Sequence, residues 1–591
     1  MTAPVVEERA GARDVDRGRG PVPAPVRVLR ARRSVPLARW LAWAAAVAVP
    51  VTFLAVFFAW PVLALVGRGF VTDGAIDLTG FAEVFAATRT WRLIGLTLGQ
   101  AVVGTVLSVG LGIPGAYVLY RCTFRGQGVV RALVTVPFVL PTVVVGVAFR
   151  ALLTESGPLG FLDLDGSFAA IVAALVFFNY SVVVRTVGGL WEHLDPRAEQ
   201  AARALGASPA RALWTVTLPA LAPAIASAAA VVFLFCATAF GVVLVLGDQR
   251  YGTIETEIWM QTVQFLDLRT AAVLSVVQIV VVTSALWVAA RARSRREHAL
   301  NLSAATRSTH PLRLRPVRGS DLAAAVLTAL VVVVLLAWPL ANLLVRSFRT
   351  ADGWGLGNYA ALGTTGGNNA LTDTVWVAAG TSLRTAATAT VIALVVGGLV
   401  ALVVSRRPRA TVARRAVGVL DSVFMLPLGV SAVTVGFGFL LTLDRPLGLD
   451  VDLRTSGLLV PIAQAVVATP LVVRTVLPVL RAIDPRQREV AATLGAPPRR
   501  VLASVDWPIA ARSLGLAIGF AFAVSLGEFG ATSFLARPDD ATLPIVIFRL
   551  IGRPGAENYG MALAASVVLA AITATVMLGA ERLRGERTGE F

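Results

Sequence analysis

The chain contains no lysine, so all 53 of its basic residues are arginines. A nucleotide-binding P-loop needs a lysine to reach the β- and γ-phosphates, and this absence excludes one. There are only two cysteines, Cys122 and Cys236, and three scattered histidines. These numbers exclude a disulfide framework, and we predict no metal site from them. No paired carboxylates or His-Glu-x-x-His motif occurs, so we also predict no catalytic residues and no cofactor.

Charge is scarce as well. Charged residues make up 15% of the chain and hydrophobic residues 56%, whereas globular proteins have about 25% and about 45–50%. This composition excludes disorder over most of the chain and is typical of a membrane protein. The net charge of +18 would suggest nucleic acid as a partner of a soluble protein. Here the arginines stand in short clusters between apolar runs, so we expect membrane lipid as a partner and no nucleic acid.

Twelve apolar runs are long enough to cross a bilayer, which takes about 20 residues per helix. They lie near residues 40–67, 95–120, 130–153, 168–190, 218–246, 271–290, 321–346, 376–405, 416–442, 456–480, 510–535 and 560–580. The first run has about 27 residues, too long for the hydrophobic segment of a signal peptide, so we interpret it as a membrane anchor. The sequence therefore predicts an all-α polytopic membrane protein.

The placement of arginine predicts the orientation of these spans. Arginines crowd every second connection, as at 121–131, 291–318 and 406–415, while the alternate connections are acidic or mixed. Because cytoplasmic loops carry the excess of positive charge, we expect the basic loops and both termini in the cytoplasm. The predicted location is a cytoplasmic (inner or plasma) membrane, which the chain crosses several times.

The chain is a tandem repeat. Residues 183–219 align without a gap with residues 472–508, a shift of 289 positions, and 17 of the 37 pairs are identical. The identities include Asp195-Pro-Arg and its counterpart Asp484-Pro-Arg, which shared hydrophobicity alone would not reproduce. With six spans in each copy, the two copies have the same orientation, related by a pseudo-two-fold axis along the membrane normal.

The repeat sets the predicted domain boundaries. A disordered Arg- and Pro-rich cytoplasmic tail covers residues 1–39, and a short cytoplasmic tail covers 583–591. The first unit covers 40–292, a cytoplasmic linker 293–319, and the second unit 320–582.

The loop after the fourth span of each copy carries the most specific sequence, at 192–219 and 481–508. In each loop an Asp-Pro pair favours a helix start and an Ala-rich stretch continues the helix. Gly206 or Gly495 then ends it, because glycine adopts the left-handed conformation easily. A second helix follows at Ser208-Pro209 or Pro497-Pro498. Each loop is thus predicted to form a helix–turn–helix outside the membrane, with a small-residue face suited to docking against a partner.

These loops resemble the EAA loop of permease subunits in bacterial ABC importers, which reads Glu-Ala-Ala, then glycine and later Leu-Pro. The resemblance covers nearly the whole chain after residue 40, as two fused permease units of the type I importer fold. Glu489 stands six residues before Gly495, as the motif requires, with Val490 in place of the first alanine. In the first copy Gln200 occupies that place, and Glu199 is shifted by one residue.

The resemblance implies the partners and the coupling residues. Two copies of a cytoplasmic ATPase subunit dock onto the loops, and an extracytoplasmic binding protein delivers the substrate. The residues placed in the coupling loops are Glu199, Gln200, Ala201, Ala202, Gly206, Glu489, Ala491, Ala492 and Gly495. The chain is therefore expected to be a transport subunit and not an enzyme.

The substrate is less defined by the sequence. Fused units resemble the thiamine and iron(III) importers, and Thr253-Ile-Glu255-Thr-Glu257 looks like the thiamine type. The run Gly527-Glu528-Phe529-Gly530 fits that type too, but occurs similarly in sulfate and molybdate permeases. We favour thiamine or iron(III). The alternative is a secondary transporter of the major facilitator type, whose expected signature between the second and third spans is missing here.

Glu528 is a candidate for the translocation pathway. We expect it inside the eleventh span, between Gly519 and Leu535, where a carboxylate costs about 2.5–3.5 kcal/mol and should face the bundle interior or water. The equivalent residue in the first copy is Ala239, so packing of the repeat does not require a carboxylate. The competing interpretation is a structural glutamate bonded to a neighbouring hydroxyl such as that of Ser525.

Overall fold

The computed structural model describes residues 37–583, apart from 73–74, 248–250, 295–308, 313, 315–320, 351–352, 407–410, 447–449 and 451. Nearly all of the predicted tails and linker therefore lies outside the described residues. The chain divides into two units after Ala45, within the first helix, and the packing of the bundle is that of the unit that begins at Ala46. Among the described residues, nine helices are long and apolar enough to span a membrane, or up to eleven if each bent helix pair is one span.

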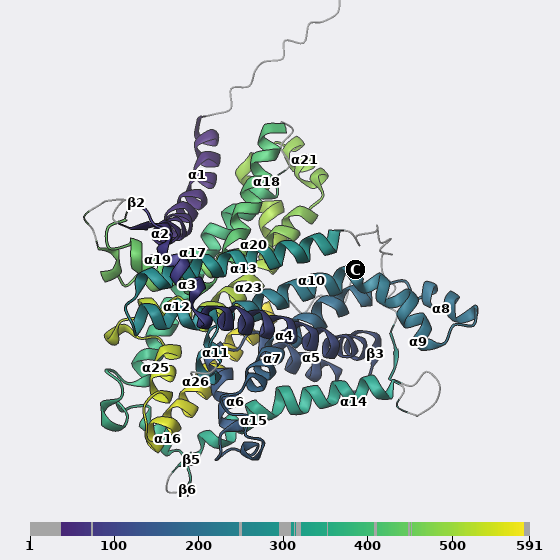
Figure 1. Ribbon diagram of the computed structural model, residues 1–591. Helices are drawn as coiled ribbons and strands as arrows, with labels where there is room; N and C mark the ends of the chain where they lie inside the picture. Colours follow the sequence, from purple (N-terminus) through teal and green to yellow (C-terminus); the bar gives the residue numbers. More distant parts are fainter. Residues whose placement is uncertain are drawn as a thin grey trace, which may run out of the picture. The chain divides into compact units, whose positions relative to one another are not determined.

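The first half consists of helices joined by short turns (Figure 1). Its α-helices are α1 (Leu37–Leu54), α2 (Trp60–Phe70), α3 (Thr79–Ala86), α4 (Thr88–Arg121), α5 (Gln127–Thr135), α6 (Thr142–Leu153), α7 (Phe168–Glu192), α8 (Arg197–Ala204), α9 (Pro209–Ala212), α10 (Leu218–Ala237), α11 (Gly241–Leu246), α12 (Ile254–Val263) and α13 (Leu268–Ser294). Short strands are β1 (Val71–Thr72), paired with β2 (Ala75–Ile76), and β3 (Cys122–Thr123), paired with β4 (His310–Pro311).

The second half repeats this order, which confirms the tandem all-α architecture. Its helices are α14 (Leu322–Leu330), α15 (Trp338–Ser347), α16 (Gly357–Ala361), α17 (Val375–Val404), α18 (Thr411–Met425), α19 (Ala432–Thr442), α20 (Leu459–Ala482), α21 (Pro485–Thr493), α22 (Pro498–Val501), α23 (Trp507–Leu526), α24 (Thr532–Leu535), α25 (Leu543–Ile551) and α26 (Ala556–Leu583). A hairpin pairs β5 (Arg349–Thr350) with β6 (Gly353–Trp354).

Some predicted spans are broken rather than straight. The third bends by 105° between Phe138 and Thr142. Its counterpart divides into α18 and α19, of which α19 has only 11 residues. The predicted eleventh span does not run from Gly519 to Leu535, because its helix ends at Leu526 and a loop precedes α24. Glu528 therefore lies in a break between helices.

Four prolines in helices follow a stretch of wider π-helix. The π segments are η1 (Ala55–Ala59), η4 (Leu213–Thr217), η5 (Val331–Ala337) and η10 (Leu502–Asp506), and each ends one residue before an X-Pro pair. Proline lacks an N–H and its ring clashes with the carbonyl four residues earlier. Widening the helix before the proline relieves this clash, and such π-bulges occur frequently at functional sites.

The first helix of each half packs against the other half. Leu54 and Phe58 belong to the apolar core of the second half, and the Phe57 ring lies 6.2 Å from that of Phe439. Reciprocally, Val331 and Leu336 belong to the core of the first half. The two halves are thus joined by exchanged helices as well as by the chain between them.

Helices α4 and α7 run parallel and closely packed. A Cβ added to Gly104 would meet Leu175, one on Gly112 would meet Val183, and one on Gly188 would meet Tyr120. Since the contacts advance together along both helices, the carboxyl ends of α4 and α7 lie at the same end of the bundle. That end also carries α8 and α9, and we call it the loop end; the opposite end, where α4 begins, is the far end.

Candidate functional site: paired loops and an axial cavity

The first loop forms the predicted helix–turn–helix, α8 followed by α9. The Asp195 carboxylate accepts a hydrogen bond from the Arg197 N–H at 2.9 Å. Gly206 turns the chain with φ of +89°, a conformation that favours glycine. The Ser208 hydroxyl then caps α9 by accepting from the Arg211 N–H. The local chemistry predicted from sequence therefore produces the expected backbone.

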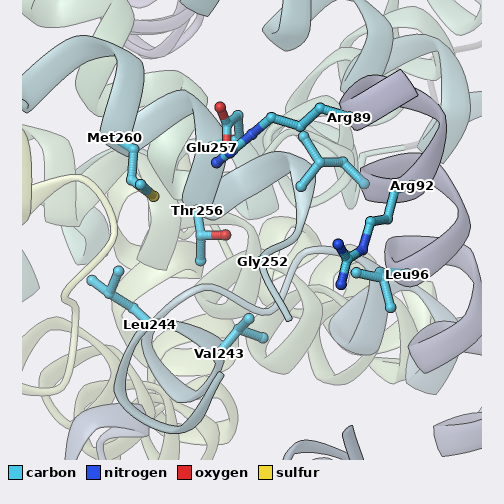
Figure 2. A pocket seen from close by; sticks show the side chains of 10 residues that line it. Arg89, Arg92, Leu96, Val243, Leu244, Gly252, Thr256, Glu257 and Met260 are labelled. Atoms are coloured by element: carbon cyan, nitrogen blue, oxygen red, sulfur yellow. The ribbon is translucent and has the colours of Figure 1, made fainter. Parts of the chain in front are cut away.

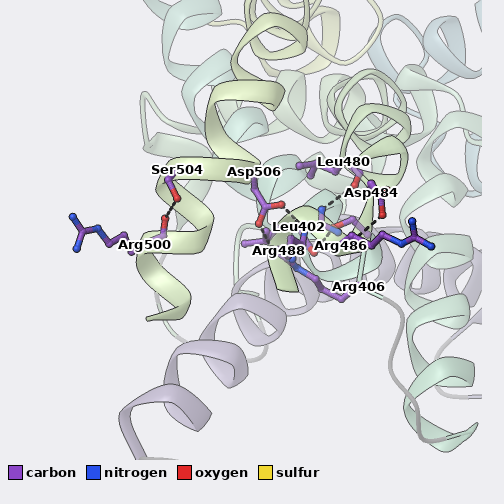
Figure 3. A network of polar contacts seen from close by, with 10 residues as sticks. Leu402, Arg406, Leu480, Asp484, Arg486, Arg488, Arg500, Ser504 and Asp506 are labelled. Carbon is purple, nitrogen blue, oxygen red and sulfur yellow. Dashed lines mark hydrogen bonds and ion pairs between the residues drawn. The ribbon is translucent and has the colours of Figure 1, made fainter. Parts of the chain in front are cut away.

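The second loop, α21 followed by α22, has the same backbone and stronger anchoring (Figure 3). Asp484 caps α21, and Gly495 has φ of +82°. Asp506, whose side chain is 2% exposed, accepts from the Arg488 Nε at 2.7 Å and from the Arg406 Nη2 at 2.6 Å. Arg488 also donates to the Leu480 carbonyl. This network, which joins α21 to η10 and to the end of α17, was not predicted from the sequence.

The anchoring differs between the two copies at equivalent positions. Glu199 stands where the second loop has Arg488, and Thr217 stands where it has Asp506. Glu199 accepts a hydrogen bond from the Thr217 hydroxyl at 3.3 Å. Its carboxylate thus contacts the base of its own loop, while Gln200 and Glu489 are both exposed.

The outer surfaces of the loops carry exposed apolar residues. Leu205 is 90% exposed and its counterpart Leu494 is 82% exposed. Ala201 and Ala492 are also exposed, and Ala202 and Ala491 are half-buried. A leucine flanked by small residues, held on a rigid turn, can enter an apolar groove of a partner protein.

A cavity of about 340 Å³ lies between the two halves. Its wall is built largely from pairs of positions 289 residues apart, so it surrounds the pseudo-two-fold axis. The lining includes Phe178 with Val467, Phe235 with Val524, Thr238 with Gly527, Ala239 with Glu528, Phe240 with Phe529, and Gly241 with Gly530. Small-molecule sites have volumes of about 300–1,000 Å³ and mostly apolar walls with a few polar groups. This cavity fits that description.

Two polar groups on the cavity wall are of particular interest. Asn179 donates to the Leu175 carbonyl at 2.9 Å, while its Oδ1 has no hydrogen-bond partner among the described residues. Glu528, 6% exposed, accepts from the Ala531 N–H at 2.7 Å, the Thr532 N–H at 3.0 Å and the Thr532 hydroxyl at 2.6 Å. Glu528 therefore lines the cavity and also holds the loop before α24, although not through Ser525 as considered above.

Four aromatic rings adjoin the cavity on the side of α12 and α25. Phe240 and Phe529 stack across the axis with ring centroids 5.5 Å apart. Trp259 lies beside Phe240, and Phe548 lies beside Phe529. The rings of Trp259 and Phe548 meet edge to face, with centroids 5.9 Å apart. Trp259 and Phe548 are again 289 residues apart. Because α12 contacts the start of α4, this aromatic cluster lies between the cavity and the far end.

The far end carries two small clefts at equivalent positions of the two halves. The cleft of about 90 Å³ in the first half is lined by Arg89, Arg92, Glu257 and Met260 (Figure 2). The Arg89 guanidinium lies 2.7 Å from the Glu257 carboxylate, which is almost buried. The cleft of the second half is lined by Thr381 and Val546, the counterparts of Arg92 and Glu257, and by Asp373, Asp539 and Arg549. The charged residues are thus placed differently in the two halves.

Sequence reasoning located the loops and Glu528 but missed the aromatic cluster and Asn179. The sequence contained part of the information needed to find the aromatic cluster. Phe240 directly follows Ala239, Phe529 directly follows Glu528, and the two phenylalanines are 289 residues apart, so they are equivalent in the repeat. Aromatic and amide residues within apolar spans are common in packed helices, and only their convergence on the axis distinguishes these.

Comparison with known proteins agrees with the architecture. Residues 108–297 match the family described as "Binding-protein-dependent transport system inner membrane component". The chain is 25% identical over 515 residues to the thiamine transport system permease protein ThiP of Brucella abortus (strain 2308), covering 85% of this chain and 90% of that protein. ThiP of Escherichia coli (strain K12) is 26% identical, over 80% of this chain and 85% of its own length.

A third relative matches a shorter stretch of the chain. The molybdenum transport system permease protein ModB of Mycobacterium tuberculosis (strain ATCC 25618 / H37Rv) is 32% identical over 235 residues, covering 38% of this chain and 86% of that protein. Most of this relative's length aligns with 38% of the chain, so the relative is about the size of one repeat unit. These matches do not support the alternative of a secondary transporter.

Proposed function

Because the chain belongs to the binding-protein-dependent transport system inner membrane components, the permeases of ABC importers, we propose that its axial cavity is the path of a small cationic nutrient. Thiamine is the substrate we favour. The observation that carries this proposal is a cavity on the pseudo-two-fold axis, lined by equivalent residues of both halves and by one carboxylate, Glu528.

The cavity supports a cation more than an anion. Glu528 is the acidic residue on its wall, and the Asn179 Oδ1, which has no hydrogen-bond partner among the described residues, adds an acceptor. When the stacked rings of Phe240 and Phe529 separate, their faces would attract a cation. The ThiP relatives of Brucella abortus and Escherichia coli, which match over most of the chain, are named as thiamine permeases. Iron(III) has no comparable support, since a cavity with one carboxylate offers few of the oxygen ligands that a hard cation prefers.

The loops are proposed to receive the ATPase. Hydrolysis of ATP falls to that partner subunit, in two copies, one on each loop, with contacts centred on Leu205 and Leu494. The π segments η4 and η10 connect the loops directly to α10 and α23, whose far ends line the cavity. A displacement of a loop by the ATPase would therefore be transmitted along one helix to the cavity wall. This assignment places the loop end, and both termini, in the cytoplasm.

The binding protein is proposed to dock at the far end. The two clefts carry different sets of charges, which would distinguish the two lobes of a binding protein. The first has Arg92 and the ion pair of Arg89 with Glu257, and the second has Asp373, Asp539 and Arg549. The aromatic cluster closes the path beneath that surface, so opening it is the step that admits the substrate.

The test compares Glu528→Gln with Thr532→Ala. Glutamine removes the charge, but its amide group would face an N–H donor of the loop, so the substitution also disturbs the structure. Thr532→Ala removes one of the same hydrogen bonds and leaves the carboxylate in place. We expect thiamine uptake in vesicles to fall at least tenfold with Glu528→Gln and less than threefold with Thr532→Ala, while assembly with the ATPase and basal ATP hydrolysis persist in both.

Equal losses in the two variants would assign Glu528 a structural role only. Unchanged uptake in both would show that the carboxylate is not used. Uptake of molybdate instead of thiamine by the wild-type complex would refute the substrate while leaving the permease assignment intact.

A further inference from the structure

One of the two cysteines and one of the three histidines meet at the loop end. Strand β3, which directly follows α4, contains Cys122, and it pairs in parallel with β4, which contains His310. The Leu312 N–H extends this pairing by donating to the Thr123 carbonyl at 3.2 Å. Asp321, which precedes α14, lies against both. The cluster therefore joins the first half, the connection between the halves, and the start of the second half.

The three side chains offer a thiol, an imidazole and a carboxylate to one point. Their potential ligand atoms all lie within 4.8 Å of one another, and no other group of three or more such residues was found in the described part of the chain. Cys122 is fully buried and Asp321 is 5% exposed. The His310 side chain is 33% exposed, which leaves one open side through which an ion could enter.

A tetrahedral ion would draw the ligand atoms of the cluster closer together. Zinc bonds of about 2.0–2.3 Å place neighbouring ligand atoms about 3.3–3.8 Å apart. The His310 Nδ1 and the Asp321 Oδ2 are 4.0 Å apart, so these two atoms would have to approach each other by about 0.5–0.7 Å to share a zinc ion. The Nδ1 also lies 3.2 Å from the Pro311 carbonyl, a contact that an ion would replace.

Tyr117 supports the remaining atoms of two of these residues. Its hydroxyl donates to the Asp321 Oδ1 at 2.7 Å and lies 3.2 Å from the His310 Nε2. Metal-binding histidines and carboxylates are usually held in this manner, with the second nitrogen or oxygen hydrogen-bonded to a neighbour. The His310 Nδ1 and the Asp321 Oδ2 lie 4.0 Å apart, and the three residues each bring one possible ligand atom within 4.8 Å of the others.

We propose that Cys122, His310 and Asp321 bind a zinc ion, with water as the fourth ligand on the open side. A sulfur–nitrogen–oxygen donor set selects zinc over magnesium or calcium, which prefer oxygen ligands alone. Bound zinc would crosslink the connection between the halves to the segment that follows α4. The site is independent of the transported substrate, since the cavity lies elsewhere in the bundle.

The test measures zinc on the full chain, purified in detergent through an affinity tag without histidine. Each variant is dialysed against zinc chloride, and the bound metal is determined by mass spectrometry. Cys122→Ser and His310→Ala remove ligands. Cys236→Ser and His193→Ala remove the other cysteine and another described histidine, and serve as matched controls. Cobalt(II) in place of zinc gives a thiolate-to-metal absorption band that reports whether sulfur is bound.

We expect one zinc per chain in the wild type and both controls, and affinity lower by more than about tenfold in the two ligand variants. The cobalt band should be lost in Cys122→Ser and kept in Cys236→Ser. Gel filtration confirms folding, and His310→Ala remains informative if the buried Cys122→Ser does not fold. Zinc binding that is absent from the wild type, or equal in wild type and His310→Ala, would overturn the proposal and leave a hydrogen-bonded cluster of Tyr117, His310 and Asp321.

Discussion

Asp506 offers the sharpest test of how the second loop is held. Its side chain is 2% exposed and is paired with Arg488 and Arg406, which are 18% and 28% exposed. Replacing Asp506 with alanine leaves two arginines facing each other without their shared carboxylate. Breaking a buried ion pair from one side costs about 3–5 kcal/mol. Because both arginines reach some water, the lower figure of about 3 kcal/mol applies, which is roughly a 150-fold change in an equilibrium.

Loss of the Asp506 ion pairs should be measurable as a change in the position of the second loop. The network fixes α21 against η10, so Asp506→Ala should increase the population of loops displaced from the ATPase-binding position. We expect weaker binding of the ATPase subunit to the purified chain and faster amide exchange in residues 485–501. Thr217→Ala is the matched control at the equivalent place of the first loop, where one hydrogen bond is worth about 0.5–1.5 kcal/mol. If Asp506→Ala and Thr217→Ala show the same ATPase affinity and the same amide exchange, the Asp506 ion pairs do not hold the second loop in place.

Three further predictions concern the loops and the cavity. Gly206→Val and Gly495→Val place a β-branched residue at positive φ and should cost about 1–2 kcal/mol each; membrane insertion should persist, and co-purification of the ATPase should fall. Glu489→Ala should reduce uptake more than Gln200→Ala, because only Glu489 matches the motif, and equal uptake in both variants and wild type would argue against coupling through these residues. Phe529→Ala removes one ring of the stacked pair and should let substrate leak down its gradient without ATP, measured as efflux from preloaded vesicles, whereas tight vesicles would show that the rings do not close the path.

Much of this architecture could be predicted from the sequence because it rests on local rules. Apolar length gives spans, and Asp484, Pro485 and Gly495 specify a helix start and end that the structure reproduces. The 289-residue shift predicted two equivalent halves. These features depend on neighbours along the chain, so one sequence is enough to read them.

Other features depend on contacts between distant segments, and the sequence did not reveal them. The break after Leu526 was hidden because residues 527–535 remain apolar enough to extend a span. Cys122 and His310 are separated by most of the first half, so their meeting could not be inferred from spacing. Asp506 and Thr217 occupy equivalent positions of the two copies, but the sequence does not show why they differ. The reason is visible only in the structure, where Arg488 binds Asp506.

The exchanged first helices have a consequence for biosynthesis. The Phe57 ring packs on Phe439, so roughly 380 residues must be made before its partner exists, which takes about 20–75 s at 5–20 residues per second. During that interval the helix has entered the bilayer with its packing face open to lipid or to other proteins. The first half therefore cannot complete this packing on the ribosome before the second half has been made at least as far as Phe439. Nascent chains arrested between the halves should therefore be degraded faster than either the completed protein or chains arrested after residue 480.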